Sequence, residues 1–491
     1  MCYEQTGPAL PPGRDQLTTK ANTIATKIVC TIGPASDSAR VLTQLIQSGM
    51  DLARINFSHG TYDQHVRTIK TIRQVSERLH RPVAILQDLP GPKLRVGKLA
   101  REPLRLQRLD KISLTTRPTN AKSKIPIAYP DLPKAVKKGD TIFLADGTIR
   151  IEVLRTRRDE VEGRVINGGD LTSGKGVNLP RLRIRVPAIT SDDKEHIKFG
   201  LENKVDIIAV SFVQKADDIR MARKVAETSG HNIFVVAKIE KREAVDDLEK
   251  IVQESDGIMV ARGDLGVELR LELVPIIQKR IIHESNRLGK PVITATQMLE
   301  SMVALPTPTR AEVTDVANAI IDGTDAVMLS EETAIGKYPV EAVRILGRVA
   351  EETERFLPKE ISAQRRAWYE HGQADALALG ACETALQVAA SAIVAPTRTG
   401  RTARLVSKYR PPLPIIALTS HPEVQRQLLL SWGVQALLTK EFSTSEEIFR
   451  EAEKTVVGMR FARTGDRIVI IAGDPKGPSG KTEILKVQTI N

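Results

Sequence analysis

The stretch from Ile233 to Glu268, IFVVAKIEKREAVDDLEKIVQESDGIMVARGDLGVE, decides the fold class of the chain. It contains two short apolar runs, Ile233 to Glu240 and Gly257 to Gly263, on either side of an amphipathic stretch of helical length. This alternation predicts two parallel strands joined by a helix. Both runs end in charged side chains, for which a strand buried on both faces has no structural need. The ends of the strands are therefore candidates for function.

The same alternation recurs along the chain, and eight runs have the composition of buried parallel strands. Eight such units that close on themselves predict an α/β fold, the TIM (β/α)8 barrel, whose catalytic groups lie at the C-terminal ends of the strands. The predicted strands are Thr26 to Gly33, Leu52 to Ser58, Val83 to Leu89, Ile207 to Val213, Ile233 to Glu240, Gly257 to Gly263, Pro291 to Gln297 and Ala326 to Thr333.

The segment between the third and fourth predicted strands has a different character. From Lys93 to Pro187 it carries 22 Lys and Arg against 10 Asp and Glu, a net +12 that equals the charge of the whole chain. Leu104 to Leu114 alternates with a period of two, and an Asp146-Gly147 turn separates two further strand patterns. We expect an inserted β domain with a basic surface.

The strand and helix alternation restarts after Ala374 and predicts a smaller open α/β domain at the C-terminus, built on the runs IVA, PIIALTS, GVQALLT and DRIVIIAG. The expected organisation is a polar tail, a barrel in two pieces, the insertion and the C-terminal domain, with a linker from Arg355 to Gln373. The predicted limits are 1–20 for the tail, 21–92 and 188–354 for the barrel, 93–187 for the insertion, and 355–491 for the C-terminal domain.

Composition excludes several classes of function. No run of about 18 uncharged apolar residues occurs, so we expect no membrane partner. The start of the chain lacks the apolar core of a signal peptide, and three cysteines are an odd number, so we expect a cytoplasmic protein. The basic segment offers only Tyr129 and Phe143 as aromatics, which argues against nucleic acid and favours an anionic small molecule. A Walker motif, GxxxxGK[ST], is absent.

Two carboxylates, Glu240 and Asp264, stand at the ends of adjacent predicted strands and can lie about 5 Å apart. A hard cation, Mg²⁺ or Mn²⁺, bound with substrate phosphate would relieve their repulsion. A glycosidase acid and base pair is the alternative, but Lys238 and Arg54 favour an anion over a sugar ring. Arg54 suits a phosphoryl group as a bidentate fork, and Lys238 offers a compact charge during transfer.

Backbone and loop groups extend this candidate site. The N–H groups of Gly263 and Asp264 are expected at a helix start, where they could hold a carboxylate. In the insertion, glycines surround Lys175, which could approach a nucleotide phosphate. Other polar groups at predicted strand ends are Asn56, Ser58, His59, Asp88, Ser211, Thr294, Thr296, Ser330, Glu331 and Glu332.

At these residues the sequence closely resembles the pyruvate kinase family. The matching motifs, from about Lys27 to the C-terminus, are TIGPAS (31–36), ARINFSHG (53–60), GVNLP (176–180), KIE (238–240), MVARGDLGVE (259–268), ATQMLESM (295–302), PTRAEVTDVANA (308–319) and MLSEETAIGKYP (328–339). The resemblance implies a barrel with an inserted β-barrel lid and a C-terminal regulatory domain. It also implies transfer of a phosphoryl group from phosphoenolpyruvate to ADP, giving pyruvate and ATP in glycolysis.

The resemblance implies a role for each matching residue. Glu240 and Asp264 would bind the divalent ion. Lys238 would stabilise the transferring phosphoryl group, and Arg54 would contact the phosphate. Gly263, Asp264 and Thr296, with Ser211 nearby, would hold the rest of the substrate, and Thr296 would relay the proton. The residues implied for the nucleotide are Asn56, Phe57, Ser58, His59, Arg95 and Lys175.

One departure from the family pattern changes an expectation. Potassium-dependent members have DTKGPEIR after the third strand, whereas this chain has DLPGPKLR from Asp88 to Arg95. Leu89 replaces a threonine that helps to coordinate potassium, and Lys93 replaces a glutamate. Because an ammonium group at Lys93 can substitute for the monovalent cation, we expect activity without potassium.

The C-terminal domain carries a candidate effector loop, TRTGRTA. Hydroxyl groups and two arginines at a helix start suit an anion, and the resemblance implies a sugar-phosphate or nucleotide effector and a homotetramer. The residues of this loop are Thr397, Arg398, Thr399, Gly400, Arg401 and Thr402. Two alternatives stay open: a catalytically inactive barrel that senses metabolites or serves as an interaction module, and another metal-dependent barrel enzyme such as an aldolase.

Overall fold

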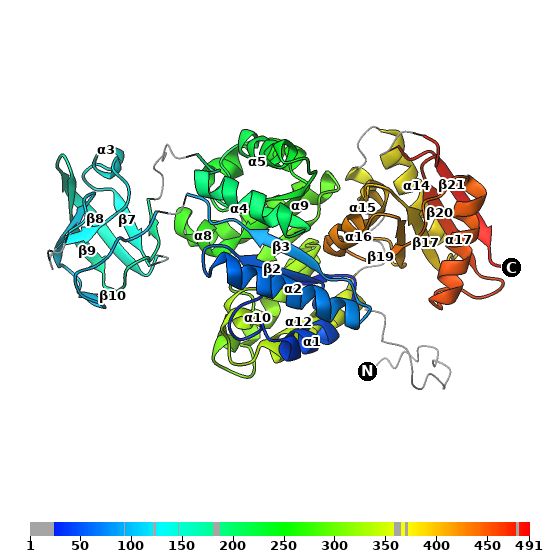
Figure 1. The fold of residues 1–491 in the computed structure, drawn as a ribbon, viewed down its shortest axis with the longest axis horizontal. Coiled ribbons are helices and arrows are strands. Elements are labelled where there is room, and N and C mark those ends of the chain that lie inside the picture. Colours follow the sequence, from blue (N-terminus) through cyan, green and yellow to red (C-terminus); the bar gives the residue numbers. More distant parts are fainter. Residues whose placement is uncertain are drawn as a thin grey trace, which may run out of the picture.

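The computed structural model describes residues 24–92, 94–119, 121, 124–145, 147–179, 187–357, 365–368, 372–477 and 481–491. Three parts follow one another along the longest axis of the molecule, with the inserted domain at one end, a closed barrel in the middle and the C-terminal domain at the other end (Figure 1). The predicted N-terminal tail lies outside the described residues.

The central part is a closed barrel of eight parallel strands in the order β1-β16-β15-β14-β13-β12-β3-β2. The predicted TIM barrel is therefore confirmed. Each strand starts within one residue of its prediction but stops one to four residues earlier, because most of the residues predicted at its end belong to the loops. The strands are β1 (Lys27–Thr31), β2 (Leu52–Asn56), β3 (Ala84–Asp88), β12 (Ile207–Val210), β13 (Phe234–Ile239), β14 (Gly257–Ala261), β15 (Val292–Ala295) and β16 (Ala326–Leu329).

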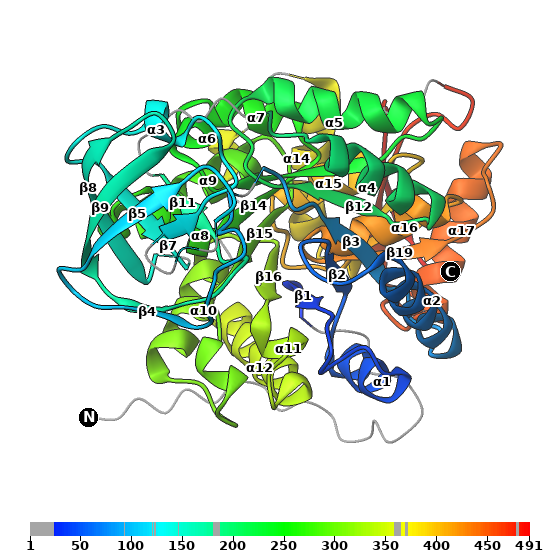
Figure 2. The same cartoon turned by 60° about the vertical axis from the view of Figure 1, so that its left-hand side comes forward.

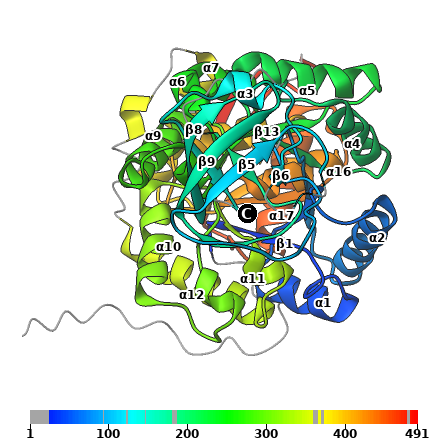
Figure 3. The same ribbon diagram turned by 90° about the vertical axis from the view of Figure 1, so that its left-hand side faces the viewer.

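Helices form a ring around these strands, seen from the side of the inserted domain in Figure 3. Their apolar faces pack on the outward-facing strand residues in one large core. The helices are α1 (Ala39–Ser48), α2 (Tyr62–Arg78), α4 (Ser191–Glu202), α5 (Ala216–Thr228), α6 (Arg242–Asp246), α7 (Leu248–Glu254), α8 (Arg262–Glu268), α9 (Val274–Arg287), α10 (Arg310–Asp322), α11 (Glu331–Ala334) and α12 (Pro339–Phe356), with short 3₁₀ turns η1 (Leu271–Leu273) and η2 (Glu300–Val303).

The inserted domain follows β3 and therefore lies at the C-terminal face of the barrel. It is a six-stranded sheet in the order β11-β7-β8-β9-β5-β6, beside a two-stranded ladder of β10 and β4. Its aliphatic core is separate from that of the barrel. Its elements are β4 (Leu104–Leu106), β5 (Lys111–Thr115), β6 (Lys124–Pro126), α3 (Leu132–Ala135), β7 (Thr141–Leu144), β8 (Ile149–Thr156), β9 (Glu160–Asn167), β10 (Gly169–Leu171) and β11 (Val177–Asn178).

The C-terminal domain is an open sheet in the order β19-β18-β17-β20-β21. Helices α14, α15 and α16 pack on one face of the sheet and α17 on the other. After η3 (Arg365–Trp368), the elements are α14 (Gln373–Gln387), β17 (Ala392–Pro396), α15 (Arg401–Lys408), β18 (Ile415–Thr419), α16 (Pro422–Gln427), η4 (Leu428–Leu430), β19 (Val434–Leu438), α17 (Ser445–Gly458), β20 (Arg467–Ala472) and β21 (Ile484–Thr489).

The C-terminal domain docks on the N-terminal face of the barrel. Leu429 and Leu430 join the cluster of apolar side chains that fills the barrel interior. Beside them, Arg410 Nη1 lies 3.0 Å from Asp325 Oδ1, and both side chains are buried. Because an unpaired buried charge is costly, this pair holds the two domains in one arrangement.

No helix among the described residues is both long enough and apolar enough to span a bilayer.

Candidate active site

The ends of β3, β12 and β13 bring four predicted side chains into one cluster. Lys238 Nζ lies 3.0 Å from Asp88 Oδ1, 2.7 Å from Ser211 Oγ and 2.9 Å from Glu240 Oε1. These three contacts use all three N–H donors of the ammonium group. Only 8% of Lys238 is exposed. A buried charge of this kind requires paired partners, which the neighbouring strands supply.

Arg54 joins the cluster from β2. Its Nε and Nη2 both lie 2.7 Å from Asp88 Oδ2, and its Nη1 donates to Thr31 Oγ1 at 2.9 Å. Asp88 therefore bridges the two cations, although the sequence identified it only as a polar strand end. The signal that could have found it is a carboxylate at the end of AILQD, a strand whose five residues are all buried.

Electrostatics in the cluster favour charged side chains. Burial alone would raise the pKa of Asp88, but Lys238 and Arg54 outweigh burial and hold that pKa below its usual value. Burial would lower the pKa of Lys238, yet Asp88 and Glu240 raise it above the ordinary lysine value. The ammonium group is thus charged throughout the physiological pH range.

Glu240 and Asp264 fit a divalent cation. Burial and then the nearby Asp264 raise the pKa of Glu240, while Lys238 opposes them. Glu240 Oε2 also accepts a hydrogen bond from Phe212 N at 2.6 Å, which fixes the carboxylate. The described residues contain no group of three or more His, Cys, Asp or Glu placed for a metal. Two hard oxygen donors suit Mg²⁺ or Mn²⁺, with water and substrate oxygens as the remaining ligands.

Thr296 lies beside Gly263 at the ends of β15 and β14. Its Oγ1 accepts a hydrogen bond from Gly263 N at 2.8 Å and donates to Ala295 O at 2.6 Å. The expected amide at the start of α8 is therefore in contact with the Thr296 hydroxyl. A substrate carboxylate at this place would share or replace that contact.

The loop after β2 holds the group predicted to meet a nucleotide. Asn56 Oδ1 accepts from Ser58 N at 3.0 Å. Phe57 is buried and stacks on His65, with ring centroids 4.2 Å apart. Phe57 therefore anchors this loop through its buried ring. The other residues predicted to meet the nucleotide, Asn56, Ser58 and His59, lie nearer the surface.

The inserted domain brings Arg95 and Lys175 together. Arg95 forms a β-bridge with Gly176, and its Nη1 donates to Gly174 O at 3.0 Å. Lys175 is exposed. Three residues further on, the Asn178 side chain hydrogen-bonds the Glu268 carboxyl of α8. A Cβ at Gly147, in the turn between β7 and β8, would lie 3.3 Å from Val267 Cγ2 of α8. This edge of the inserted domain therefore faces the strand ends, and Figure 2 shows the inserted domain on the side of the barrel where α8 lies.

The segment between β3 and the inserted domain passes over Ser211. Leu89 is buried, and its carbonyl accepts from Ser211 Oγ at 2.6 Å. Gly91 has a φ of +63°, and a Cβ there would lie 3.0 Å from Ser211 Cβ, so the close approach requires glycine. Lys93, the predicted substitute for potassium, lies outside the described residues.

Comparison with known proteins shows the family to which the chain belongs. Residues 23–343 match the family model "Pyruvate kinase, barrel domain", and residues 375–488 match "Pyruvate kinase, alpha/beta domain". The chain belongs to the pyruvate kinase family. It is 47% identical to "Pyruvate kinase 2" of Synechocystis over 95% of this chain and 79% of that protein. It is 42% identical to a pyruvate kinase of Clostridium acetobutylicum over 95% of this chain and 99% of that protein.

A solved structure supports the same assignment. The crystal structure of a pyruvate kinase from Cryptosporidium parvum superposes with a TM-score of 0.89 at 37% identity, and covers 95% of this chain and 96% of that chain. The family is one of enzymes that bind phosphoenolpyruvate, ADP or ATP, and pyruvate, and it implies a divalent metal such as Mg²⁺. The resemblance drawn from the sequence motifs is therefore confirmed.

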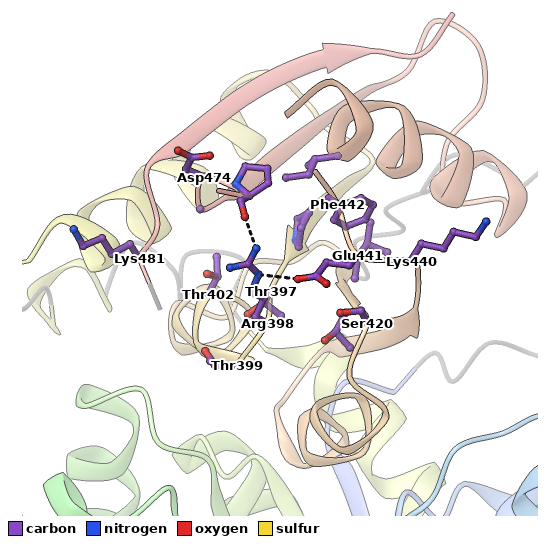
Figure 4. A pocket seen from close by; sticks show the side chains of 16 residues that line it. Thr397, Arg398, Thr399, Thr402, Ser420, Lys440, Glu441, Phe442, Asp474 and Lys481 are labelled. Atoms are coloured by element: carbon purple, nitrogen blue, oxygen red, sulfur yellow. Dashed lines mark hydrogen bonds and ion pairs between the residues drawn. The ribbon is translucent and has the colours of Figure 1, made fainter. Parts of the chain in front are cut away.

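The candidate effector loop borders a pocket in the C-terminal domain (Figure 4). The pocket encloses about 610 Å³, including its open mouth. Thr397, Arg398, Thr399 and Thr402 line it, whereas Gly400 and Arg401 do not. The sequence did not identify the other side of the pocket, formed mainly by Ser420, Lys440, Glu441, Phe442, Asp474 and Lys481.

Glu268 generates a prediction for stability. Burial raises its pKa to about 7, although Lys241 and the Asn178 hydrogen bond oppose the rise. The folded protein thus keeps this proton at pH values where the unfolded chain has lost it, and stability falls as pH rises from about 4.5 to 7. In wild type, this proton loss should lower the free energy of unfolding by about 3 kcal/mol, and Glu268→Gln should remove that fall. Denaturant unfolding of both proteins between pH 5 and 8 measures the difference.

The matched control is Glu272→Gln, which changes a side chain that is 66% exposed. Its difference from wild type should vary by less than about 0.5 kcal/mol across the same pH range. A Glu268→Gln difference that does not grow with pH would contradict the assigned pKa.

Proposed function

We propose that the cluster of Lys238, Arg54, Asp88 and Glu240 is the site at which this enzyme transfers a phosphoryl group from phosphoenolpyruvate to ADP. We further propose that the enzyme needs no potassium and responds to an effector in its C-terminal domain. The observation that carries the catalytic proposal is the buried ammonium group of Lys238, within 3.0 Å of three side chains at adjacent strand ends.

Phosphoryl transfer depends on neutralising the negative charge on the oxygens of the phosphoryl group as it is transferred. Lys238 supplies a fixed positive charge that the cluster keeps protonated. Arg54, oriented by Asp88 and Thr31, contacts the phosphate of the substrate. Ser211 orients Lys238 by accepting one of its N–H groups. Because these partners hold both cations before substrate arrives, little reorganisation is needed during transfer.

Glu240 and Asp264 bind Mg²⁺ or Mn²⁺ in this proposal. When bound, the ion supplies charge neutralisation for phosphoryl oxygens. The amides of Gly263 and Asp264 and the hydroxyl of Thr296 hold the carboxylate end of the substrate. Thr296 also relays the proton that converts the enolate to pyruvate, since a hydroxyl of high pKa acts better as a relay than as the acid.

The nucleotide lies between the barrel and the inserted domain, which acts as a lid. Asn56, Phe57, Ser58 and His59 form its barrel side, and Arg95 and Lys175 reach it from the lid. The net +12 of the insertion supports this proposal, because positive potential favours the approach and closure over two phosphorylated substrates.

Lys238→Met tests the catalytic proposal. Turnover should drop at least about 100-fold, because the negative charge of the phosphoryl group in the transition state loses the ammonium group that neutralises it. Binding of Mn²⁺, measured by electron paramagnetic resonance, should persist. The control is Lys250→Met, which changes a side chain 76% exposed on α7. Unchanged turnover in Lys238→Met would exclude the assigned role. Absence of pyruvate formation in the wild type would favour an inactive, metabolite-sensing barrel.

Independence of potassium is proposed from Leu89 and Lys93. Leu89 is buried next to Ser211 of the cluster, and its side chain has no oxygen that could coordinate a cation. Leu89→Thr combined with Lys93→Glu should make activity depend on potassium, because the change restores cation ligands and removes the ammonium group. Assays of the wild type and variant in sodium-only and potassium buffers measure this. Equal rates of the double variant in both buffers would refute the proposal.

The effector proposal rests on the pocket in Figure 4. Arg398 donates to Pro475 O and to Gly477 O, and its Nε lies 3.6 Å from Glu441 Oε1. The pocket thus offers one guanidinium group and several hydroxyl groups, with the carboxylates of Glu441 and Asp474 in the same lining. The side chains of Lys440 and Lys481 extend outward from its edges in Figure 4. Such a lining suits a sugar phosphate or a nucleotide monophosphate.

Arg398→Met should raise the effector concentration needed for half-maximal response at least about tenfold, since it removes a charged hydrogen-bonding partner. Titration of a panel of sugar phosphates and nucleotides at subsaturating phosphoenolpyruvate measures the response. Lys454→Met, on the exposed surface of α17, should respond like wild type. A response that survives in Arg398→Met would place the effector elsewhere.

We also propose a homotetramer in the cytoplasm, as the family resemblance implies. Sedimentation velocity tests the assembly, and a monomer at micromolar concentration would contradict it.

A further inference from the structure

The backbone is unusual where β15 ends. Thr296 has a φ of +69° and Gln297 a φ of +55°, so two successive non-glycine residues adopt the left-handed conformation. They are the only adjacent pair of this kind in the described part of the chain. A β-branched residue strongly disfavours this conformation. Such strain persists only where the surroundings hold it in place, and it concentrates at functional sites.

Arg262 provides the contacts that hold this backbone. Its Nε and Nη2 donate to Thr296 O at 3.2 and 2.7 Å, and Nη2 also donates to Gln297 O at 3.1 Å. The same nitrogen lies 2.8 Å from Met298 Sδ. The guanidinium group is therefore directed at the carbonyl oxygens of both strained residues. Its side chain is only 10% exposed.

The other side of the guanidinium group is anchored in the helical ring. Nη1 lies 2.6 Å from Asp315 Oδ2 on α10 and 3.5 Å from Gln278 Oε1 on α9. All five N–H groups of Arg262 thus have partners within the protein. Arg262 has no donor left for a substrate, which separates its role from that of Arg54.

Arg262 and the residue after it both contact Thr296. Arg262 holds the carbonyl of Thr296, while Gly263, the next residue, donates its N–H to Thr296 Oγ1. Both ends of residue 296 are therefore tied to the same two-residue segment at the start of α8. If the backbone relaxed to a negative φ, the hydroxyl would turn away from Gly263.

We propose that Arg262 is a positioning residue that keeps residues 296 and 297 in the left-handed conformation and so aims the Thr296 hydroxyl at the substrate. This inference rests on the role proposed for Thr296. Lysine cannot replace Arg262 in this role, because one ammonium group cannot reach two carbonyls and a carboxylate with the geometry of a planar fork.

The test compares Arg262→Met with Thr296→Ala in the full chain with Mg²⁺. Arg262→Met should lower kcat about 100-fold, as expected for a displaced catalytic group, and leave KM for ADP within about threefold of wild type. Exchange of the methyl protons of pyruvate in deuterium oxide, followed by NMR, should slow to the same degree, because it reports proton delivery without phosphoryl transfer. Arg262→Lys should resemble Arg262→Met.

A rescue variant separates positioning from general support of the fold. Glycine adopts a positive φ without strain, so Arg262→Met combined with Gln297→Gly should recover at least about tenfold of the lost kcat. The matched control is Arg223→Met. Arg223 likewise bridges two carbonyls, Ile233 O and Glu254 O, and an aspartate, but at the opposite end of the barrel. Its loss should lower thermal stability and leave the exchange rate near that of wild type.

The double variant Arg262→Met with Thr296→Ala decides the outcome. If Arg262 acts through Thr296, kcat of the double variant should lie within about threefold of the slower single variant. If the kcat losses of the two single variants multiply in the double variant, the inference about Arg262 is overturned but the role proposed for Thr296 stands. A folded Arg262→Met enzyme with a normal rate of pyruvate proton exchange would have the same meaning. Full activity of Thr296→Ala would instead overturn the role proposed for Thr296 and this inference with it. If Gln297→Gly does not restore activity, Arg262 only supports the fold and the inference is overturned.

Discussion

The arrangement of the catalytic face depends on the buried ammonium group of Lys238. Removing this charge from water is unfavourable unless partners surround it, and the partners come from β3, β12 and the end of β13. Asp88 in turn needs Arg54 from β2. The partners of these charges come from four consecutive strands, β13, β12, β3 and β2, so the cluster forms only when these strands pair in the correct register. The neighbouring carboxylates Asp88 and Glu240 also raise the pKa of Lys238, so its ammonium group stays charged at neutral pH.

The two faces of the barrel differ in their contacts: one carries the charged cluster and the other docks the C-terminal domain. At the C-terminal face, the strand ends carry the charged cluster, and the inserted domain contacts α8 through Asn178 and Glu268. At the N-terminal face, Leu429 and Leu430 complete the interior core, and Arg410 pairs with Asp325. The candidate effector pocket lies in the domain that makes these latter contacts.

Several features could be predicted because they follow from local composition. The eight barrel strands are mostly apolar, since both faces of the sheet are buried, and the polar residues at or near their ends mark the site. The edge strand β21, by contrast, alternates between half-buried and exposed residues over ILKVQT and gives no buried-strand signal. The partners of Lys238 and the strained backbone at Thr296 could not be predicted either, because both depend on contacts between segments far apart in the chain.

The sequence by itself determined the fold class, the family and the identity of the residues at the strand ends, because periodicity and short motifs are local properties. Only the tertiary structure decided how those residues act on one another. Asp88 became a bridge between two cations that lie 34 and 150 positions away in the chain. Arg262 became the support of a left-handed turn 34 and 35 positions away. The physical reason is that burial and charge pairing arise when distant segments meet, and no local pattern encodes those distances.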